Sequence, residues 1–196
     1  MSQPAILLES GMMYHIWTHA NGQENLFRSG ENYQYFLKKY FQYIGLVAET
    51  FAYCLMPNHL HLMIRIRKEA ALLNLKKQDL QGFKNLGGPV VVSQQFSNLF
   101  NAYSKAYNKM YHRKGSLFVP NFKRKRISSE SYFIALVVYI HRNPIHHRFA
   151  DNIDDWPYSS WHEYIIEDGS RLNISEVISW FGNKETLIRD HREIIG

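Results

Sequence analysis

Apolar side chains recur at three- and four-residue intervals in three segments of the chain, which predicts three amphipathic helices. They cover residues 31–46, residues 93–111 and residues 130–142. We expect each apolar face to pack in a core rather than to form a platform for stacking bases. A short further helix is expected around residues 175–181.

The third of these helices has a signal at each end. Ser128 or Ser129 can cap its first turn. Pro144 is expected to end it at Arg142, because proline cannot continue the hydrogen bonds of a helix and disfavours helical geometry in the residue before it.

Residues that favour β-structure predict strands over residues 12–18 and 116–127, and a hairpin over residues 51–66. The hairpin turns at Pro57-Asn58, because proline presets φ at the first central turn position and asparagine tolerates the second. The order strand, helix, strand–strand, helix, strand, with one more helix, is typical of an α+β fold: an antiparallel sheet with helices packed on one face.

Two segments differ from this pattern. Residues 67–89 are rich in lysine and glutamine and end in Gly87-Gly88-Pro89, so we interpret them as an insertion with a short helix over residues 70–75. Residues 1–150 are expected to form the main domain, and residues 151–196 a C-terminal extension that its tryptophans hold against that domain.

Composition narrows the class of protein. The 196 residues suffice for one well-buried domain, with 45% hydrophobic and 20% charged residues. No apolar run approaches the ~20 residues of a membrane helix, and the single cysteine, Cys54, cannot form an internal disulfide, so a cytoplasmic location is expected. A net charge of +6 and an aromatic content of 15% suit an anionic partner such as single-stranded nucleic acid.

Two histidines follow the hairpin turn. Side chains alternate between the faces of a strand, so His59 and His61 point the same way while Leu60 and Leu62 point the other. Two neighbouring imidazoles can hold a metal ion, although such a pair can also be packed or exposed without binding anything. A metal site needs a third ligand and a reacting group.

Tyr139 and Asn143 can supply both if the chain stays helical through this last turn, because residues four apart share one edge of a helix. The amide oxygen of Asn143 with the nitrogens of His59 and His61 makes a mixed ligand set that suits Mg²⁺ or Mn²⁺. A phenol has a pKa of about 10 and is a weak nucleophile at neutral pH. A divalent ion that polarises a phosphate can help Tyr139 to attack it.

A run of four cations, Lys123, Arg124, Lys125 and Arg126, ends the last predicted strand. It places two cations on each face of that strand. The run can be a solvated edge that resists aggregation. We favour a DNA-binding strip that contacts phosphates, because this strand is expected near the histidine strand.

The motifs together closely resemble the single-tyrosine transposases of the HUH (histidine–hydrophobic–histidine) superfamily, the group that includes the REP-associated tyrosine transposases. The resemblance spans roughly residues 12–165, and the order and spacing of its parts make it specific. The matching stretches are Tyr14-His15-Ile16-Trp17, Met56-Pro57-Asn58-His59-Leu60-His61-Leu62, Gly115-Ser116-Leu117-Phe118, Tyr139-Ile140-His141-Arg142-Asn143-Pro144 and Trp156-Pro157-Tyr158-Ser159-Ser160.

This resemblance implies a ferredoxin-like (RRM-type) fold, a homodimer, and metal-dependent cleavage and rejoining of single-stranded DNA, including hairpin-forming DNA, through a 5′-phosphotyrosine. His59 and His61 match the histidine pair and Tyr139 the nucleophile. Asn143 takes the place of the polar third ligand, which is often glutamine in relatives. His141 could replace it only if the end of the helix unwinds.

Two other functions fit parts of the pattern. A domesticated relative would bind single-stranded nucleic acid without cutting it, and a metal-dependent hydrolase would use water in place of Tyr139. The other histidines of the chain that we considered are expected to be surface or packing residues: His15, His19, His112, His146 and His147.

Overall fold

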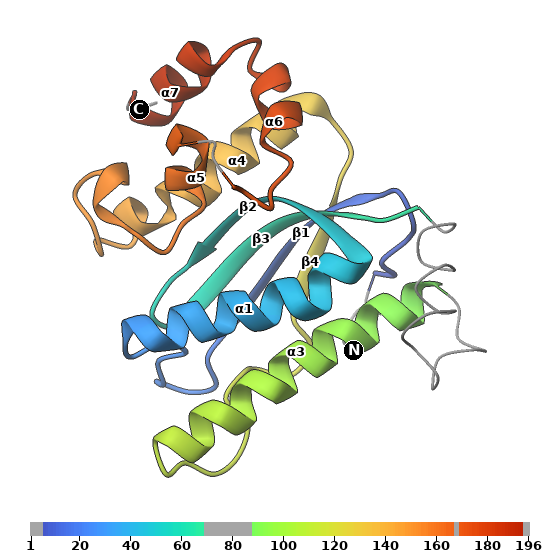
Figure 1. Cartoon of the computed structure of the whole chain (residues 1–196), viewed down its shortest axis with the longest axis vertical. Coiled ribbons are helices and arrows are strands. Elements are labelled where there is room, and N and C mark those ends of the chain that lie inside the picture. Colours follow the sequence, from blue (N-terminus) through green and yellow to red (C-terminus); the bar gives the residue numbers. More distant parts are fainter. Residues whose placement is uncertain (1–5, 69–87, 167–168, 194–196) are drawn as a thin grey trace.

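The computed structural model describes residues 6–68, 88–166 and 169–193. Its centre is a four-stranded antiparallel sheet in the order β2-β3-β1-β4 (Figure 1). The interpretation of residues 67–89 as an insertion with a short helix lies almost wholly outside the described residues. The strands are β1 (Met13–His19), β2 (Ala48–Leu55), β3 (His59–Ile66) and β4 (Lys123–Ile127).

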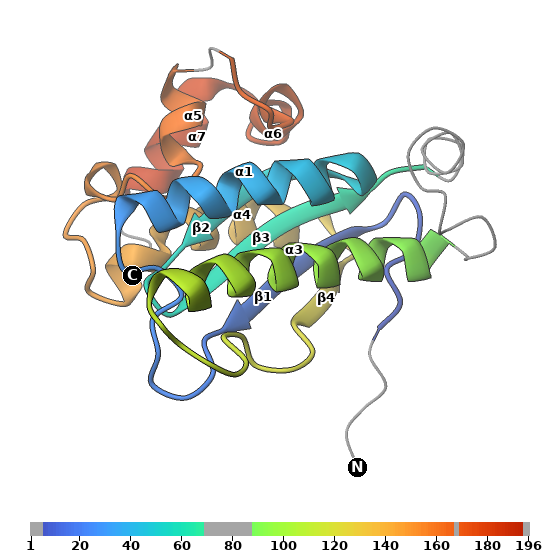
Figure 2. The ribbon, with the colours of Figure 1, turned by 60° about the horizontal axis from the view of Figure 1, so that its bottom comes forward.

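Helices cover both faces of the sheet. The long helices α1 (Gly30–Val47) and α3 (Gly88–Met110) lie side by side on one face, and α4 (Glu130–His146) lies on the other (Figure 2). The C-terminal part adds a 3-10 turn and three short helices next to α4: η1 (Ile153–Asp155), α5 (Trp161–Ile166), α6 (Ile174–Trp180) and α7 (Lys184–Arg192).

The element order from β1 to β4, with this strand order, is the split βαβ arrangement of ferredoxin-like folds, so the expected α+β class is confirmed. Helices were expected on one face, and α4 adds a second covered face. The reason is that α4 follows the completed unit and its apolar residues pack on β2 and β3: Phe133, Leu136, Val137 and Ile140.

Strand alternation explains why both faces can be covered. On β3, Leu60, Leu62 and Ile64 belong to the core beneath α1 and α3, whereas Met63 belongs to the core beneath α4. His59 and His61 share the face of Met63. The two histidines therefore lie in the layer between the sheet and α4.

Two predicted boundaries are corrected. The helix expected to stop at Arg142 continues through Pro144 to His146, and Ser129 is the residue that caps its start. Pro144 has no N–H and so leaves one carbonyl of the preceding turn without its helical partner. The helix continues because the next turn still closes, with His147 N–H donating to Asn143 O (3.1 Å).

The last strand of the sheet is shorter than residues 116–127. It begins at Lys123, and residues 116–122 form a loop that touches the sheet through a single bridge between Ala20 and Phe118. Pro120 cannot donate to a neighbouring strand, and Asn121 adopts a left-handed conformation with φ of 59°. These two residues end the extended backbone before β4.

The C-terminal segment is joined to the sheet at the edge of β2. Leu55 N–H donates to Tyr158 O and Ser160 N–H donates to Tyr53 O, each at 2.9 Å. The indole N–H of Trp156 donates to Leu55 O at 3.0 Å. The segment thus occupies hydrogen-bonding groups that an edge strand would otherwise leave open.

A buried chain of hydrogen bonds links this segment to α4 and α7. Tyr53 N–H donates to Ser160 Oγ (2.9 Å), whose hydroxyl donates to His141 Nε2 (2.7 Å). His141 Nδ1–H donates to His191 Nε2 (2.9 Å), and His191 Nδ1–H to Leu187 O (2.7 Å). Burial lowers the pKa of both histidines, that of His191 to about 4, so both are neutral and every bond in the chain has one donor. His141 is committed to this network and does not face His59.

None of the described helices is long and apolar enough to cross a membrane.

The packing of α4 can be measured with one pair of variants. Phe133→Ala removes a fully buried ring between the sheet and the extension and is expected to lower the free energy of unfolding by about 3–5 kcal/mol. Phe149→Ala deletes the same side chain at a position that is 43% exposed and is expected to cost much less. Urea unfolding measures both, and equal losses would contradict this account of the core.

Candidate functional site

The site is built on the face of the sheet that α4 covers. His59 and His61 lie on β3, are almost fully buried, and have ring centroids 5.3 Å apart. Asn143 comes from α4, and its Oδ1 lies 3.0 Å from His59 Nε2. The structure thus brings Asn143 to His59 and seats both histidines beneath α4.

The ring of His59 lies between two amide oxygens. Its Nδ1 is 2.7 Å from Asn58 Oδ1 while its Nε2 faces Asn143 Oδ1. Burial lowers the pKa of His59 to about 4, so the ring is neutral and carries a single N–H. It can donate to only one of the two oxygens.

A cation at His59 Nε2 would resolve this conflict. Nδ1–H would donate to Asn58, and the lone pair of Nε2 would face the same ion as Asn143 Oδ1. The other end of this amide, Asn143 Nδ2, is buried and has no hydrogen-bond partner among the described residues. The donor chemistry therefore fits a divalent ion.

His61 is held in the same manner by a residue that sequence reasoning missed. His15 Nε2 lies 2.9 Å from His61 Nδ1, which leaves His61 Nε2 available as a ligand. Burial lowers the pKa of His15 to about 4 and that of His61 to about 2, so both rings stay neutral. The available signal was the antiparallel pairing of two His-containing strands, which places His15 beside His61.

No group of three histidine, cysteine, aspartate or glutamate side chains within the described ranges is arranged to hold a metal. A centre built from His59 and His61 therefore depends on the amide oxygen of Asn143.

Tyr139 lies at the open side of the site. Its ring centroid is 5.5 Å from that of His61 and 6.3 Å from that of His15, in edge-on contacts. Its side chain is 40% exposed, whereas His15, His59, His61 and Asn143 are buried. The tyrosine is therefore accessible to a large substrate and lies beside the histidines of its own chain.

More histidines surround the pair than the sequence indicated. The ring of His19 lies 5.0 Å from that of His59, and the ring of His147 lies 4.7 Å from it. The ring centroid of His146 lies 6.1 Å from that of Tyr139. All three are exposed, in agreement with the expectation that they are surface residues. They reach the site because β1 pairs with β3 and because α4 continues past Pro144.

The four cations of β4 divide between the two faces of the sheet. Lys125 pairs in register with His15, and its ammonium lies 4.7 Å over the ring of Tyr132. Lys123 shares that face, whereas Arg124 and Arg126 point to the other. The strand therefore brings two of the four cations to the histidine face.

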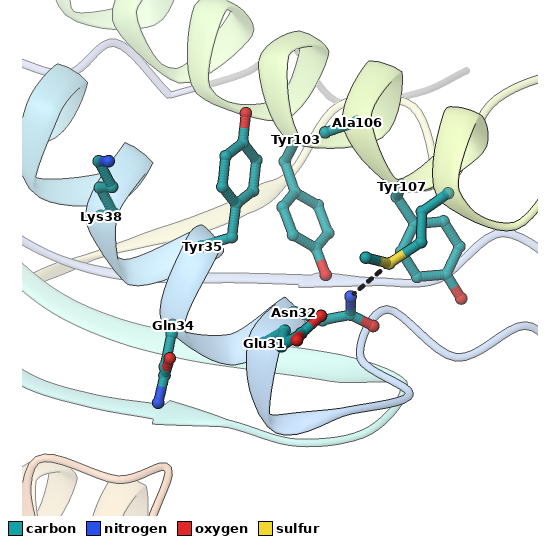
Figure 3. Close-up of a pocket in the computed structure, with 9 residues that line it drawn as sticks. Glu31, Asn32, Gln34, Tyr35, Lys38, Tyr103, Ala106 and Tyr107 are labelled. Carbon is teal, nitrogen blue, oxygen red and sulfur yellow. Dashed lines mark hydrogen bonds between the residues drawn. The ribbon is translucent and has the colours of Figure 1, made fainter.

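A separate hollow of about 480 Å³ lies between α1 and α3, across the sheet from the histidines (Figure 3). Two of its polar side chains are already engaged: Asn32 donates to Met110 Sδ (3.5 Å), and the Tyr103 hydroxyl donates to Leu26 O (2.5 Å). This hollow is not part of the site.

No family model matches the chain. A curated Haemophilus influenzae protein named as a REP-associated tyrosine transposase is 24% identical over 116 residues, which are 58% of this chain and 59% of the relative. The chain thus spans less than two thirds of that relative. A solved REP-associated tyrosine transposase bound to a REP hairpin has a TM-score of 0.60 and 17% identity, covering 85% of this chain and 86% of that one. The resemblance that the motifs indicated is confirmed, and the structural match establishes the fold.

Buried neutral histidines predict a pH-dependent stability in the presence of a chelator. The folded-state pKa values of His15 and His59 are about 4, below the ordinary 6.5, so the unfolded chain takes up protons first as the pH falls. Stability is therefore expected to fall between about pH 6.5 and about pH 4, by at most about 1.4 kcal/mol per pH unit for each such histidine. Urea unfolding at pH 7.5 and 5.5 measures the loss.

The matched variants are His15→Gln and His112→Gln. The first removes a buried titrating group and is expected to reduce the loss, whereas the second changes an exposed histidine and leaves it unchanged. Equal wild-type stability at both pH values would contradict the buried, neutral assignment.

Proposed function

We propose that this chain cleaves and rejoins single-stranded DNA through a covalent 5′-phosphotyrosine at Tyr139, as a transposase. The observation that carries the proposal is the assembly of one accessible tyrosine beside two buried histidines, with an amide oxygen 3.0 Å from one imidazole nitrogen. β3 supplies the histidines, and α4 supplies Tyr139 and Asn143. The resemblance to REP-associated tyrosine transposases supports the same chemistry.

His59, His61 and Asn143 are the proposed ligands of a divalent ion. Asn58 lies at Nδ1 of His59 and His15 lies at Nδ1 of His61, so both Nε2 atoms can offer a lone pair to a metal ion. Two nitrogens and one amide oxygen suit Mg²⁺ or Mn²⁺. When bound, such an ion would polarise a phosphate oxygen and offset the charge that develops during attack.

The reaction exchanges one phosphodiester for another. The phenolic oxygen of Tyr139 attacks the phosphorus and loses its proton to the surrounding water or bases. The bond between the phosphorus and the 3′ oxygen of the preceding nucleotide breaks, and that oxygen takes up a proton to become a 3′-hydroxyl. The 5′-phosphate of the following nucleotide stays bonded to Tyr139. Attack by a 3′-hydroxyl on this bond rejoins the strand and releases the tyrosine.

The proposed substrate is single-stranded DNA, including strands that fold into hairpins. The structural relative was solved with a REP hairpin, and this chain is basic, with a net charge of +6. Lys123 and Lys125 lie on the histidine face, where they can contact phosphates next to the reacting one. A homodimer is part of the same proposal.

The nucleophile is tested with end-labelled single-stranded DNA from the flanks of the gene, with Mg²⁺ or Mn²⁺. The wild type is expected to form a denaturant-resistant adduct, and Tyr139→Phe none, because phenylalanine lacks the attacking oxygen. Tyr132→Phe, on the same helix, is the matched control and should retain the adduct.

Each other outcome of that assay points to another function. Adducts that persist in Tyr139→Phe contradict the assignment of the nucleophile. Cleavage that needs metal but ignores Tyr139 indicates a hydrolase that uses water. Binding with neither adduct nor cleavage indicates a nucleic-acid-binding descendant.

The ligand set is tested without any reaction. Mn²⁺ at about 100 times its dissociation constant should stabilise the wild type by about 2.7 kcal/mol, because only the folded chain assembles the site. His61→Gln and Asn143→Ala should lose most of this gain, and His112→Gln should keep it. Thermal unfolding with Mn²⁺ and with a chelator measures the gain, and an equal gain in His61→Gln would contradict the site.

A further inference from the structure

A second hollow of about 340 Å³ lies where the pairing of β1 with β4 ends, between α3 and the loop of residues 116–122. Thr18 and Arg124 line it from the sheet, and their side chains share the face opposite to His59 and His61. A volume of this size is at the lower end of those that hold small organic ligands. Its lining is rich in hydroxyl and amide groups, and none of the lining residues is acidic.

Thr18, one of the residues that line this hollow, carries an unsatisfied polar atom. The residue is 1% exposed, and its hydroxyl has no hydrogen-bond partner within the described part of the chain. The register of β1 with β4 ends at Trp17 and Lys123, one residue before Thr18, after which the chain of residues 116–122 departs from the sheet. A buried hydroxyl without a partner is destabilising, so such atoms call for an explanation. A ligand in the hollow provides one.

Arg124 supplies a partly buried positive charge. No carboxylate within the described parts of the chain forms a salt bridge with it, whereas its neighbour Arg126, on the same face, lies 3.5 Å from Glu9. Burial lowers the pKa of Arg124, which means that the site disfavours its charge unless an anion offsets it. The guanidinium is held 4.4 Å over the ring of Phe122.

Aromatic rings form one side of the hollow. The ring centroid of Phe122 lies 4.7 Å from that of Phe96 and 5.8 Å from that of Phe100. Both Phe100 and Phe122 remain partly exposed. Ser97 and Asn101 of α3 line the same space. Rings that can stack on a base, amides and hydroxyls that can meet its edge, and an arginine for phosphate are the groups that recognise an unpaired nucleotide.

We propose that this hollow binds one unpaired nucleotide of the DNA strand, with its base against Phe100 and Phe122 and its phosphate at Arg124. The Thr18 hydroxyl bonds the bound nucleotide. The inference rests on the proposed function for the source of the strand, but the hollow is separate from the phosphotyrosine chemistry. Because Arg124 and Lys125 point to opposite faces of β4, a strand that occupies both sites crosses the exposed edge of the sheet.

The test is equilibrium binding of a fluorescein-labelled single-stranded DNA of 15 or so nucleotides, in the Tyr139→Phe background with a chelator, so that no cleavage occurs. Arg124→Gln is expected to weaken binding about tenfold, because it removes both the phosphate partner and the cation over Phe122. Arg126→Gln removes the same charge from the same face outside the hollow and should weaken it about twofold or less. Equal losses of affinity in the two variants would mean that Arg124 contributes only its charge, and would overturn the proposal.

Thr18→Val separates a ligand contact from a structural role. The hydroxyl has no partner among the described residues, so the variant should be as stable as the wild type or more so, yet bind the strand several-fold more weakly. Unchanged binding would overturn the role of Thr18. Deoxynucleoside monophosphates should displace the strand from the wild type at lower concentration than inorganic phosphate does. Equal displacement by phosphate would mean a simple anion site and overturn the nucleotide assignment.

These results are independent of the adduct assay. If binding depends on Arg124 and Thr18 but the wild type forms no adduct, the nucleotide site is supported and the proposed cleavage is contradicted. If the wild type forms adducts but its binding does not depend on Arg124, only the nucleotide site is contradicted.

Discussion

The structure depends on the burial of uncharged imidazoles between the sheet and α4. His15, His59 and His61 would each cost free energy if protonated there, so the fold holds them as bases with available lone pairs. The same burial that packs this layer therefore keeps nitrogen lone pairs available for the proposed metal site. Asn143 can approach His59 only because α4 lies flat on that face, and Tyr139 stays accessible because it projects from the edge of the same helix.

The C-terminal segment is what keeps α4 in place. It pairs with the edge of β2, and the buried chain from Tyr53 through Ser160, His141 and His191 to Leu187 joins the sheet, α4 and α7. His141 lies between Tyr139 and Asn143 in sequence and points away from the site. The extension therefore holds α4 from behind, while Tyr139 and Asn143 face the histidines.

Sequence patterns predicted the parts of the fold that long apolar periodicity specifies. The three long helices, the hairpin and its turn follow from local sequence, and the spacing of His59, His61, Tyr139 and Asn143 indicated the site together with the family resemblance. The end of α4 was wrong because tertiary packing allows Pro144 inside a helix. The start of β4 was wrong because Pro120 and Asn121 determine the backbone there. The positions of His15, His19 and His147 beside the pair depend on the pairing of β1 with β3 and on the last turn of α4, which no local pattern reveals. The unpaired hydroxyl of Thr18 likewise follows from where two strands part.

The occupied edge of β2 limits how copies of this chain can associate. Sheets often extend across a molecular boundary by pairing open edges, but here the Tyr158–Ser160 backbone already uses the groups at one edge. The other edge is β4, and two copies joined there would bring their runs of lysine and arginine together. Continuous intermolecular sheets are therefore disfavoured at both ends, and contacts between copies are left to the helices and loops.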